Sequence, residues 1–197
     1  MKKILILSLL VFASPLFANL TCFLTTGSSS WPYSPYIVHL KDVGDSLDLW
    51  ESYGITDNFE TFCIERNVNF SPNRTYTATI DDSIIYGGGY PVLQTTTKMI
   101  YAAYTNGSLS SYTGNYVQNA VWYSQHNSGN LGYYFGGDIS SYDTAGYQDV
   151  MALNLWDGSR DIQSHLVRIS AVPAPGAVTL GGIGLAFIGW LKRKRSM

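Results

Sequence analysis

The chain has 197 residues, of which 46% are hydrophobic and only 13% are charged. This composition suits one modest domain and excludes long coiled coils and acidic disordered tails. Six of the twelve basic residues lie at the two ends and all fourteen acidic residues lie between them, which gives the middle of the chain a net charge of −8. Such a charge argues against nucleic acid and against an anionic membrane surface as partners. The terminal basic residues are Lys2, Lys3, Lys192, Arg193, Lys194 and Arg195.

The N-terminus has the three parts of a secretory signal peptide. Lys2 and Lys3 precede an apolar run over residues 4–12, and the segment that follows ends on the small residue Ala18. This pattern predicts a signal peptide over residues 1–18, with cleavage after Ala18 and export of the chain. A lipoprotein signal that ends at Cys22 is the alternative, but the preceding Thr is a poor residue at that position.

The body begins and ends with short strand-like runs. These runs are rich in β-branched and aromatic residues and are broken by Gly, Asn, Asp or Pro. They predict strands over residues 36–40, 47–50, 59–64, 75–80, 150–156 and 165–170.

Two segments between these runs have helical periodicity instead. Residues 95–104 and 116–126 place apolar side chains three and four positions apart, and each segment is followed by Asn and Gly. Strands, then two helices, then strands predict an α+β, mostly β fold. We therefore expect residues 19–170 to form a single domain of short antiparallel strands with two short helices.

The C-terminal residues 171–197 form a further three-part segment. The Pro-rich residues 172–176 stop any helix, residues 177–191 carry no charge, and residues 192–195 are all basic. The apolar part predicts a C-terminal transmembrane helix in the inner membrane, short for a bilayer, with its basic end in the cytoplasm.

This tail resembles the PEP-CTERM sorting signal, which is found on exported proteins of Gram-negative bacteria that make exopolysaccharide. The matching motif is Pro173-Ala174-Pro175 followed by Gly176, with Ala174 in place of the usual Glu. The resemblance implies processing by an exosortase, a membrane transpeptidase, and delivery to the cell surface or the extracellular matrix.

The chain has only two cysteines, Cys22 and Cys63. In an exported protein the default expectation for such a pair is a disulfide. Cys22 lies in a Ser/Thr/Gly-rich stretch that we expect to be frayed, whereas Cys63 lies between two apolar residues of a predicted strand. A Cys22–Cys63 disulfide and a buried, unpaired Cys63 are both open at this point.

A second resemblance rests on two short motifs, FCIE at residues 62–65 and VQNAVW at residues 117–122. Their pairing is similar to the thioester domain of bacterial surface adhesins. In that family a cysteine thiol and a glutamine carboxamide condense, with loss of ammonia, into an internal thioester. The matching positions in this chain are Cys63 and Gln118.

Such a bond needs particular surroundings. The thiolate is the nucleophile, and the carboxamide carbon becomes electrophilic when hydrogen-bond donors polarise its oxygen and water is excluded. We expect Phe62, Trp122 and Tyr123 to supply the dry enclosure. Glu65 has two interpretations: a surface ion pair with Arg66, which is favoured, or an orienting role beside the thiol.

Other chemistry finds little support in the sequence. His39, His126 and His165 are scattered without ligand spacing, so we expect no metal site and no cofactor. A hydrolase built on Cys63 and His126 lacks a visible orienting third residue.

The sequence therefore supports covalent attachment to an amine or hydroxyl group of a surface or matrix polysaccharide or protein, through Cys63 and Gln118. Such a protein reacts once and is not an enzyme. The alternative is a non-covalent matrix or carbohydrate-binding protein without a thioester, for which 15 Tyr and 5 Trp residues supply stacking surfaces.

Overall fold

The computed structural model describes residues 20–27, 34–43, 46–68, 70–85, 92–158 and 160–170. They form one antiparallel sheet with the strand order β3-β2-β1-β4-β5-β6, together with three α-helices. The elements, in chain order, are β1 (Leu20–Thr26), β2 (Tyr36–Leu40), α1 (Ser46–Ser52), β3 (Phe59–Thr61), β4 (Arg74–Asp81), α2 (Thr95–Thr105), α3 (Gly114–His126), the 3₁₀ turns η1 (Tyr134–Gly137) and η2 (Tyr147–Asp149), β5 (Val150–Trp156) and β6 (Asp161–Arg168).

The sheet curls until its two ends meet. The chain that continues β3 runs beside β6, where Leu166 N donates to Phe62 O at 3.1 Å and Ile64 N donates to Ser164 O at 2.9 Å. Between these two bonds Cys63 and His165 face each other as an isolated antiparallel bridge. The curled sheet is therefore closed by residues 62–64, and Cys63 lies at the point of closure.

The inside of the curl is one of two hydrophobic cores. Alternate residues of β1, Leu20, Cys22 and Leu24, point into it and are almost fully buried, as the period of two in a strand requires. Trp50 from α1 fills the same core, and its indole N–H donates to Thr21 O at 3.1 Å.

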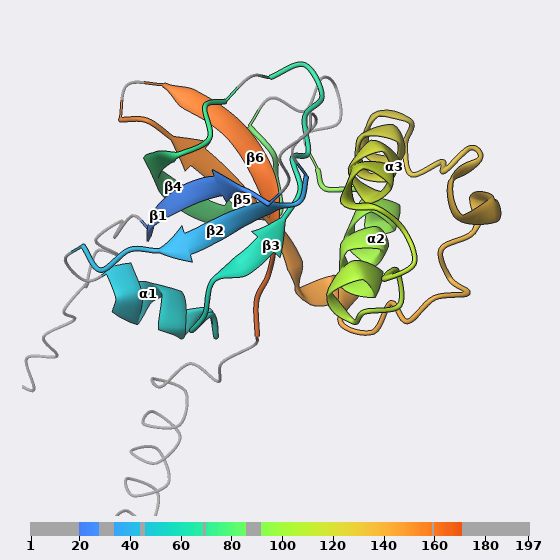
Figure 1. The fold of residues 1–197 in the computed structure, drawn as a ribbon, viewed down its shortest axis with the longest axis horizontal. Coiled ribbons are helices and arrows are strands. Elements are labelled where there is room, and N and C mark those ends of the chain that lie inside the picture. Colours follow the sequence, from blue (N-terminus) through green and yellow to red (C-terminus); the bar gives the residue numbers. More distant parts are fainter. Residues whose placement is uncertain are drawn as a thin grey trace, which may run out of the picture.

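The second core lies between the outer face of the sheet and the helices. Figure 1 shows α2 and α3 side by side at one end of the curled sheet. Helix α3 begins at an N-cap, because the Thr113 side chain accepts a hydrogen bond from Tyr116 N. Its buried face carries Val117, Ala120 and Val121, which pack with apolar residues of α2 and of the sheet.

The mostly β, single-domain expectation is confirmed, and so are the two helices, within a few residues at their ends. The strand predicted over residues 47–50 is wrong, since these residues lie in α1, where Trp50 is fully buried in the sheet core. The expectation that the chain around Cys22 is frayed is also wrong, because β1 is paired on both sides, with β2 and β4.

The predicted signal peptide over residues 1–18 and the tail over residues 171–197 lie outside the described residues. Within the residues that the structure does describe, no helix is long and apolar enough to span a membrane.

Candidate functional site

The backbone N–H and C=O of Cys63 make no hydrogen bond to the neighbouring strand β6. In an antiparallel ladder, residues that face each other between flanking hydrogen bonds bring their side chains close together. Cys63 and His165 form such a pair, so the N–H and C=O of Cys63 point away from β6. Burying a backbone N–H or C=O without a hydrogen bond costs free energy. Another element must therefore supply hydrogen-bond partners for these two groups.

The side chain of Gln118 satisfies both. Cys63 N donates to Gln118 Oε1 at 3.0 Å, and Gln118 Nε2 donates to Cys63 O at 2.7 Å. The hydroxyl of Ser34 donates to the same Oε1 at 2.9 Å. The carboxamide thus takes the place of a missing strand beside Cys63, and its carbonyl oxygen accepts two hydrogen bonds. Gln118 is fully buried and Cys63 is 2% exposed.

A second glutamine of α3 makes a comparable contact without any sulfur. Gln125, two turns after Gln118 and also fully buried, accepts from Gln94 N at 3.0 Å and donates to Val92 O at 3.0 Å. Because seven residues are close to two helical turns, the two glutamines lie on the same face of α3. Two glutamine side chains of α3 thus hydrogen-bond to the backbone of other segments, and only Gln118 does so at a cysteine.

The sulfur itself faces His165. Cys63 Sγ lies 3.9 Å from Nε2 of His165, whose ring has Tyr36 and Phe70 edge-on at centroid distances of 5.7 and 4.9 Å. Burial raises the pKa of the Cys63 thiol, the negative charge of Glu65 raises it further, and a hydrogen bond with Tyr36 opposes the shift. Burial also lowers the pKa of His165 to about 3. The thiol and the imidazole are therefore both neutral at pH 7.

His165 is the site residue that the sequence analysis missed. The histidine considered beside Cys63 was His126, but the structure places His126 Nε2 3.5 Å from Arg66 N instead. No sequence signal identifies His165, because the register between residues 62–64 and β6 depends on closure of the sheet.

Two of the expected neighbours of the pair, Phe62 and Trp122, have different surroundings. Phe62 is fully buried but packs edge-on against Tyr104 of α2, at 4.8 Å between ring centroids. Trp122 is partly buried on α3, one turn after Gln118. The aromatic rings against His165 are instead those of Tyr36 and Phe70.

Glu65 is not part of a surface ion pair, so that interpretation is wrong. Its side chain is 3% exposed, and its carboxylate accepts from Ser164 N at 2.7 Å and from Ser164 Oγ at 3.0 Å. Gln163 Nε2 also donates to the backbone carbonyl of Glu65 at 2.6 Å. Arg66 is exposed and forms no ion pair within the described residues. Glu65 therefore anchors the chain after Cys63 to β6.

The two cysteines are both buried and unpaired. Cys22 points into the core inside the curled sheet, and burial raises its pKa to about 12. The structure therefore contains no Cys22–Cys63 disulfide. In the part of the chain that is described, no cluster of three or more His, Cys, Asp or Glu residues could hold a metal ion.

A cavity of about 710 Å³ opens beside α3. It is lined from α3 by Asn119, the residue after Gln118, and by Trp122, and from the chain after Cys63 by Arg66 and Asn67. Neither Cys63 nor Gln118 lines it.

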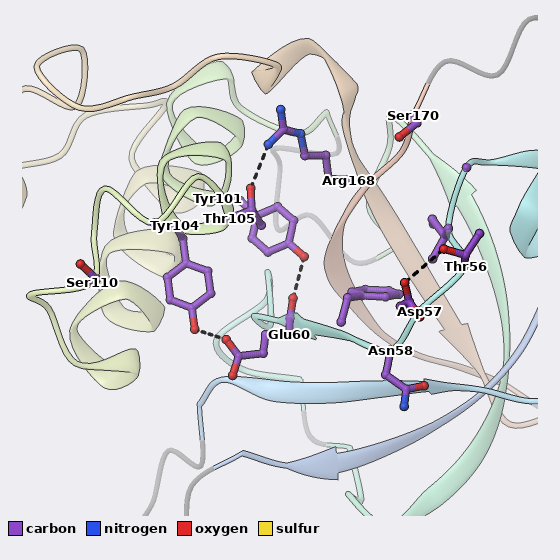
Figure 2. A pocket seen from close by; sticks show the side chains of 14 residues that line it. Thr56, Asp57, Asn58, Glu60, Tyr101, Tyr104, Thr105, Ser110, Arg168 and Ser170 are labelled. Carbon is purple, nitrogen blue, oxygen red and sulfur yellow. Dashed lines mark hydrogen bonds between the residues drawn. The ribbon is translucent and has the colours of Figure 1, made fainter.

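Another cavity, of about 610 Å³, lies between the chain around β3 and the end of α2. Figure 2 shows Tyr104 pointing at the Glu60 carboxylate, to which its hydroxyl donates, while the Tyr101 hydroxyl donates to Glu60 O at 2.7 Å. Arg168 points at Thr105, with 3.2 Å between its Nη1 and Oγ1. This cavity contains neither member of the Cys63–Gln118 pair.

The chain matches no protein-family model, no curated protein and no solved structure. What this site can do therefore rests on its own geometry and chemistry.

Proposed function

We propose that this chain is an exported, exosortase-sorted surface or extracellular-matrix protein of a Gram-negative bacterium, which attaches covalently to its partner through an internal thioester between Cys63 and Gln118. The observation that carries the covalent part is the position of the Gln118 carboxamide, bonded on both sides to the backbone of Cys63. The export and sorting part rests on the two ends of the sequence alone.

The surroundings of the carboxamide favour attack on its carbon. Two donors at 3.0 and 2.9 Å, Cys63 N–H and the Ser34 hydroxyl, face Gln118 Oε1. Donors in this position stabilise the negative charge that develops on the oxygen when a nucleophile adds to the carbonyl. The buried position excludes water, which would otherwise hydrolyse the product.

The forming step balances within the site. Cys63 Sγ bonds to Cδ of Gln118, the bond from Cδ to Nε2 breaks, and ammonia leaves with the thiol proton. His165, with Nε2 at 3.9 Å from the sulfur, is the group placed to carry that proton. Because burial keeps the thiol protonated and makes the imidazole a weak base, the step depends on the polarised carbonyl and on proximity more than on a preformed thiolate.

The attaching step is a single acyl transfer. A primary amine or a hydroxyl of the partner adds to Cδ, the bond from Cδ to Sγ breaks, and the proton of the nucleophile returns to the sulfur. The product is an amide or an ester between Gln118 and the partner, together with a free Cys63 thiol. Since both side chains are buried, the nucleophile enters after a local opening of the site.

The intact mass of the purified chain tests the proposal. The expected result is a mass below that of the unmodified chain by one ammonia. Added methylamine then raises this mass by one methylamine and frees the Cys63 thiol, while the lost ammonia is not regained. A chain of full mass with two thiols that react after unfolding contradicts the thioester.

Three variants make the test specific. Cys63→Ala and Gln118→Ala both restore the full mass and prevent methylamine incorporation. Gln125→Ala is the matched control, because it removes a buried amide-to-backbone contact from the same helix and leaves the mass deficit in place. Methylamine adducts in Gln118→Ala would show that the chemistry lies elsewhere.

A separate measurement tests the sorting part. Peptide mapping of the protein recovered from an exosortase-containing host is expected to show no peptide from residues 177–197, whereas a strain without the exosortase retains them. Retention of the tail in both strains contradicts processing and leaves the thioester unaffected.

A further inference from the structure

We infer that the cavity beside α3 is a non-covalent binding site for an uncharged saccharide. This inference goes beyond the proposed attachment and does not require the thioester, because neither Cys63 nor Gln118 lines the cavity. Its volume of about 710 Å³ lies within the range of cavities that hold a small ligand. The lining residues are Arg66, Asn67, Asn119, Trp122, Tyr123, His126, Asn127, Tyr133 and Tyr134.

Aromatic rings form one part of the lining and are held in place. Tyr133 is 73% exposed, a large exposed area for an aromatic side chain. It stacks on the buried Tyr134 with 4.3 Å between centroids, and its hydroxyl donates to that of Tyr134 at 2.9 Å. Tyr134 in turn packs against Tyr116 and Tyr123 of α3. A ring fixed in this way can stack on the apolar face of a pyranose without losing side-chain entropy on binding.

Trp122 adds a polar group without a partner. Its indole N–H is buried and makes no hydrogen bond among the described residues. An indole N–H is a donor only, and it usually finds an acceptor when it is buried. Because Trp122 also lines the cavity, a ligand hydroxyl that reaches it after a small rotation of the ring would satisfy it.

The remaining polar groups suit hydroxyls better than charges. Three asparagines line the cavity, and no carboxylate does. Asn119 and Asn127 each use the amide nitrogen on α3 backbone, which leaves their oxygens as acceptors. Burial, and then the neighbouring Arg66, lower the pKa of His126, so that this ring is neutral at pH 7. A saccharide hydroxyl both donates and accepts and can pair with each of these groups.

The charge of the protein disfavours an anionic ligand. Arg66 is the one charged residue in the lining at pH 7, whereas the middle of the chain carries a net charge of −8. A single exposed guanidinium does not overcome repulsion of a polyanion by that field, but its N–H groups can donate to hydroxyl oxygens.

Affinity electrophoresis of the full chain tests the inference, in gels that contain dextran, galactomannan or mixed-linkage β-glucan. The expected result is retardation by at least one of these neutral polysaccharides, little changed by 0.2 M salt. Trp122→Ala and Tyr133→Ala are each expected to weaken binding about tenfold, as loss of a stacking surface does. Tyr133 is exposed in a turn, so its variant keeps the fold even if Trp122→Ala does not.

The matched control is Trp156→Ala, which removes an aromatic side chain that is 41% exposed at the end of β5, away from this cavity. Its mobility is expected to equal that of the unchanged protein, and so is that of Cys63→Ala, which separates this site from the thioester. Absence of retardation in all three gels overturns the inference. Retardation that survives both Trp122→Ala and Tyr133→Ala, or that 0.2 M salt abolishes, also overturns it.

Discussion

The amide group of Gln118 and the backbone of Cys63 are bonded to each other twice, through Cys63 N to Oε1 at 3.0 Å and through Nε2 to Cys63 O at 2.7 Å. The contact joins α3 to the point where the curled sheet closes, across 55 residues of sequence. The sulfur takes no part in these two bonds. The fold therefore uses the glutamine as a structural clamp, and the thiol beside it is available for other chemistry.

This separation predicts unequal costs for two substitutions. Gln118→Ala leaves Cys63 N–H, Cys63 C=O and the Ser34 hydroxyl buried without a partner, and it should lower the free energy of unfolding by about 3 kcal/mol. Cys63→Ala keeps both backbone bonds and should cost about 1 kcal/mol for the lost sulfur contacts. Urea unfolding of the two variants beside the unchanged chain measures the difference. Equal losses would mean that the backbone pairing contributes little.

The buried imidazole predicts a dependence of stability on pH. In the folded chain the pKa of His165 is about 3, whereas the usual value is 6.5. As the pH falls below about 6.5, the unfolded chain binds a proton that the folded chain does not, so the free energy of unfolding decreases toward acid. Urea unfolding at pH 7.5 and pH 5 should show this decrease. In His165→Gln this decrease should be smaller. Part of what remains should come from His126, because burial and the charge of Arg66 lower its pKa as well.

If the free energy of unfolding of His165→Gln falls with pH as steeply as that of the unchanged chain, His165 is protonated in the folded protein as readily as in the unfolded one. Hydrogen bonds from Ser83 and Ser140 lower the pKa values of Asp81 and Asp138. These two carboxylates lose their contribution to stability only at more acidic pH, so they do not affect this comparison.

The reactivity of the two cysteines tests whether both are buried and outside a disulfide. Burial raises the pKa of Cys22 to about 12, and the pKa of Cys63 is also raised, so that neither should react with iodoacetamide at pH 8 in the folded protein. After unfolding in urea at pH 8 and labelling without reductant, Cys22 should be alkylated. Mass spectrometry of the peptides measures this, and a Cys22 that needs reduction before it reacts would contradict the unpaired state.

Glu65 is buried and Arg66 is exposed, so substitutions at these two positions should change the stability by different amounts. Glu65→Ala removes a carboxylate that accepts two hydrogen bonds from Ser164 in a buried site, and it should lower the free energy of unfolding by roughly 3 kcal/mol. Arg66→Ala changes an exposed side chain and should alter stability by less than about 0.5 kcal/mol. Thermal unfolding of both variants tests the contrast. A small effect of Glu65→Ala would show that its two hydrogen bonds from Ser164 contribute little to stability.

Local pattern predicted strands in β2 to β6 and both helices α2 and α3, but it missed β1 in the middle of the sheet. The runs at residues 36–40 and 150–156 are strands with those bounds, and both helices follow from apolar spacing and their Asn and Gly ends. The segment at 47–50 was misassigned because four apolar and acidic residues do not distinguish a strand from one turn of a helix, and contact of Trp50 with the sheet core decided the matter.

The sequence by itself determined the residue types that a thioester requires, Cys63 and Gln118, along with the two terminal segments on which the expectation of export rests. Only the tertiary structure decided that these two residues meet, that His165 rather than His126 faces the sulfur, and that Glu65 lies inside. The reason is that strand closure and helix packing join residues 55 to 102 positions apart, and no local periodicity encodes such a register.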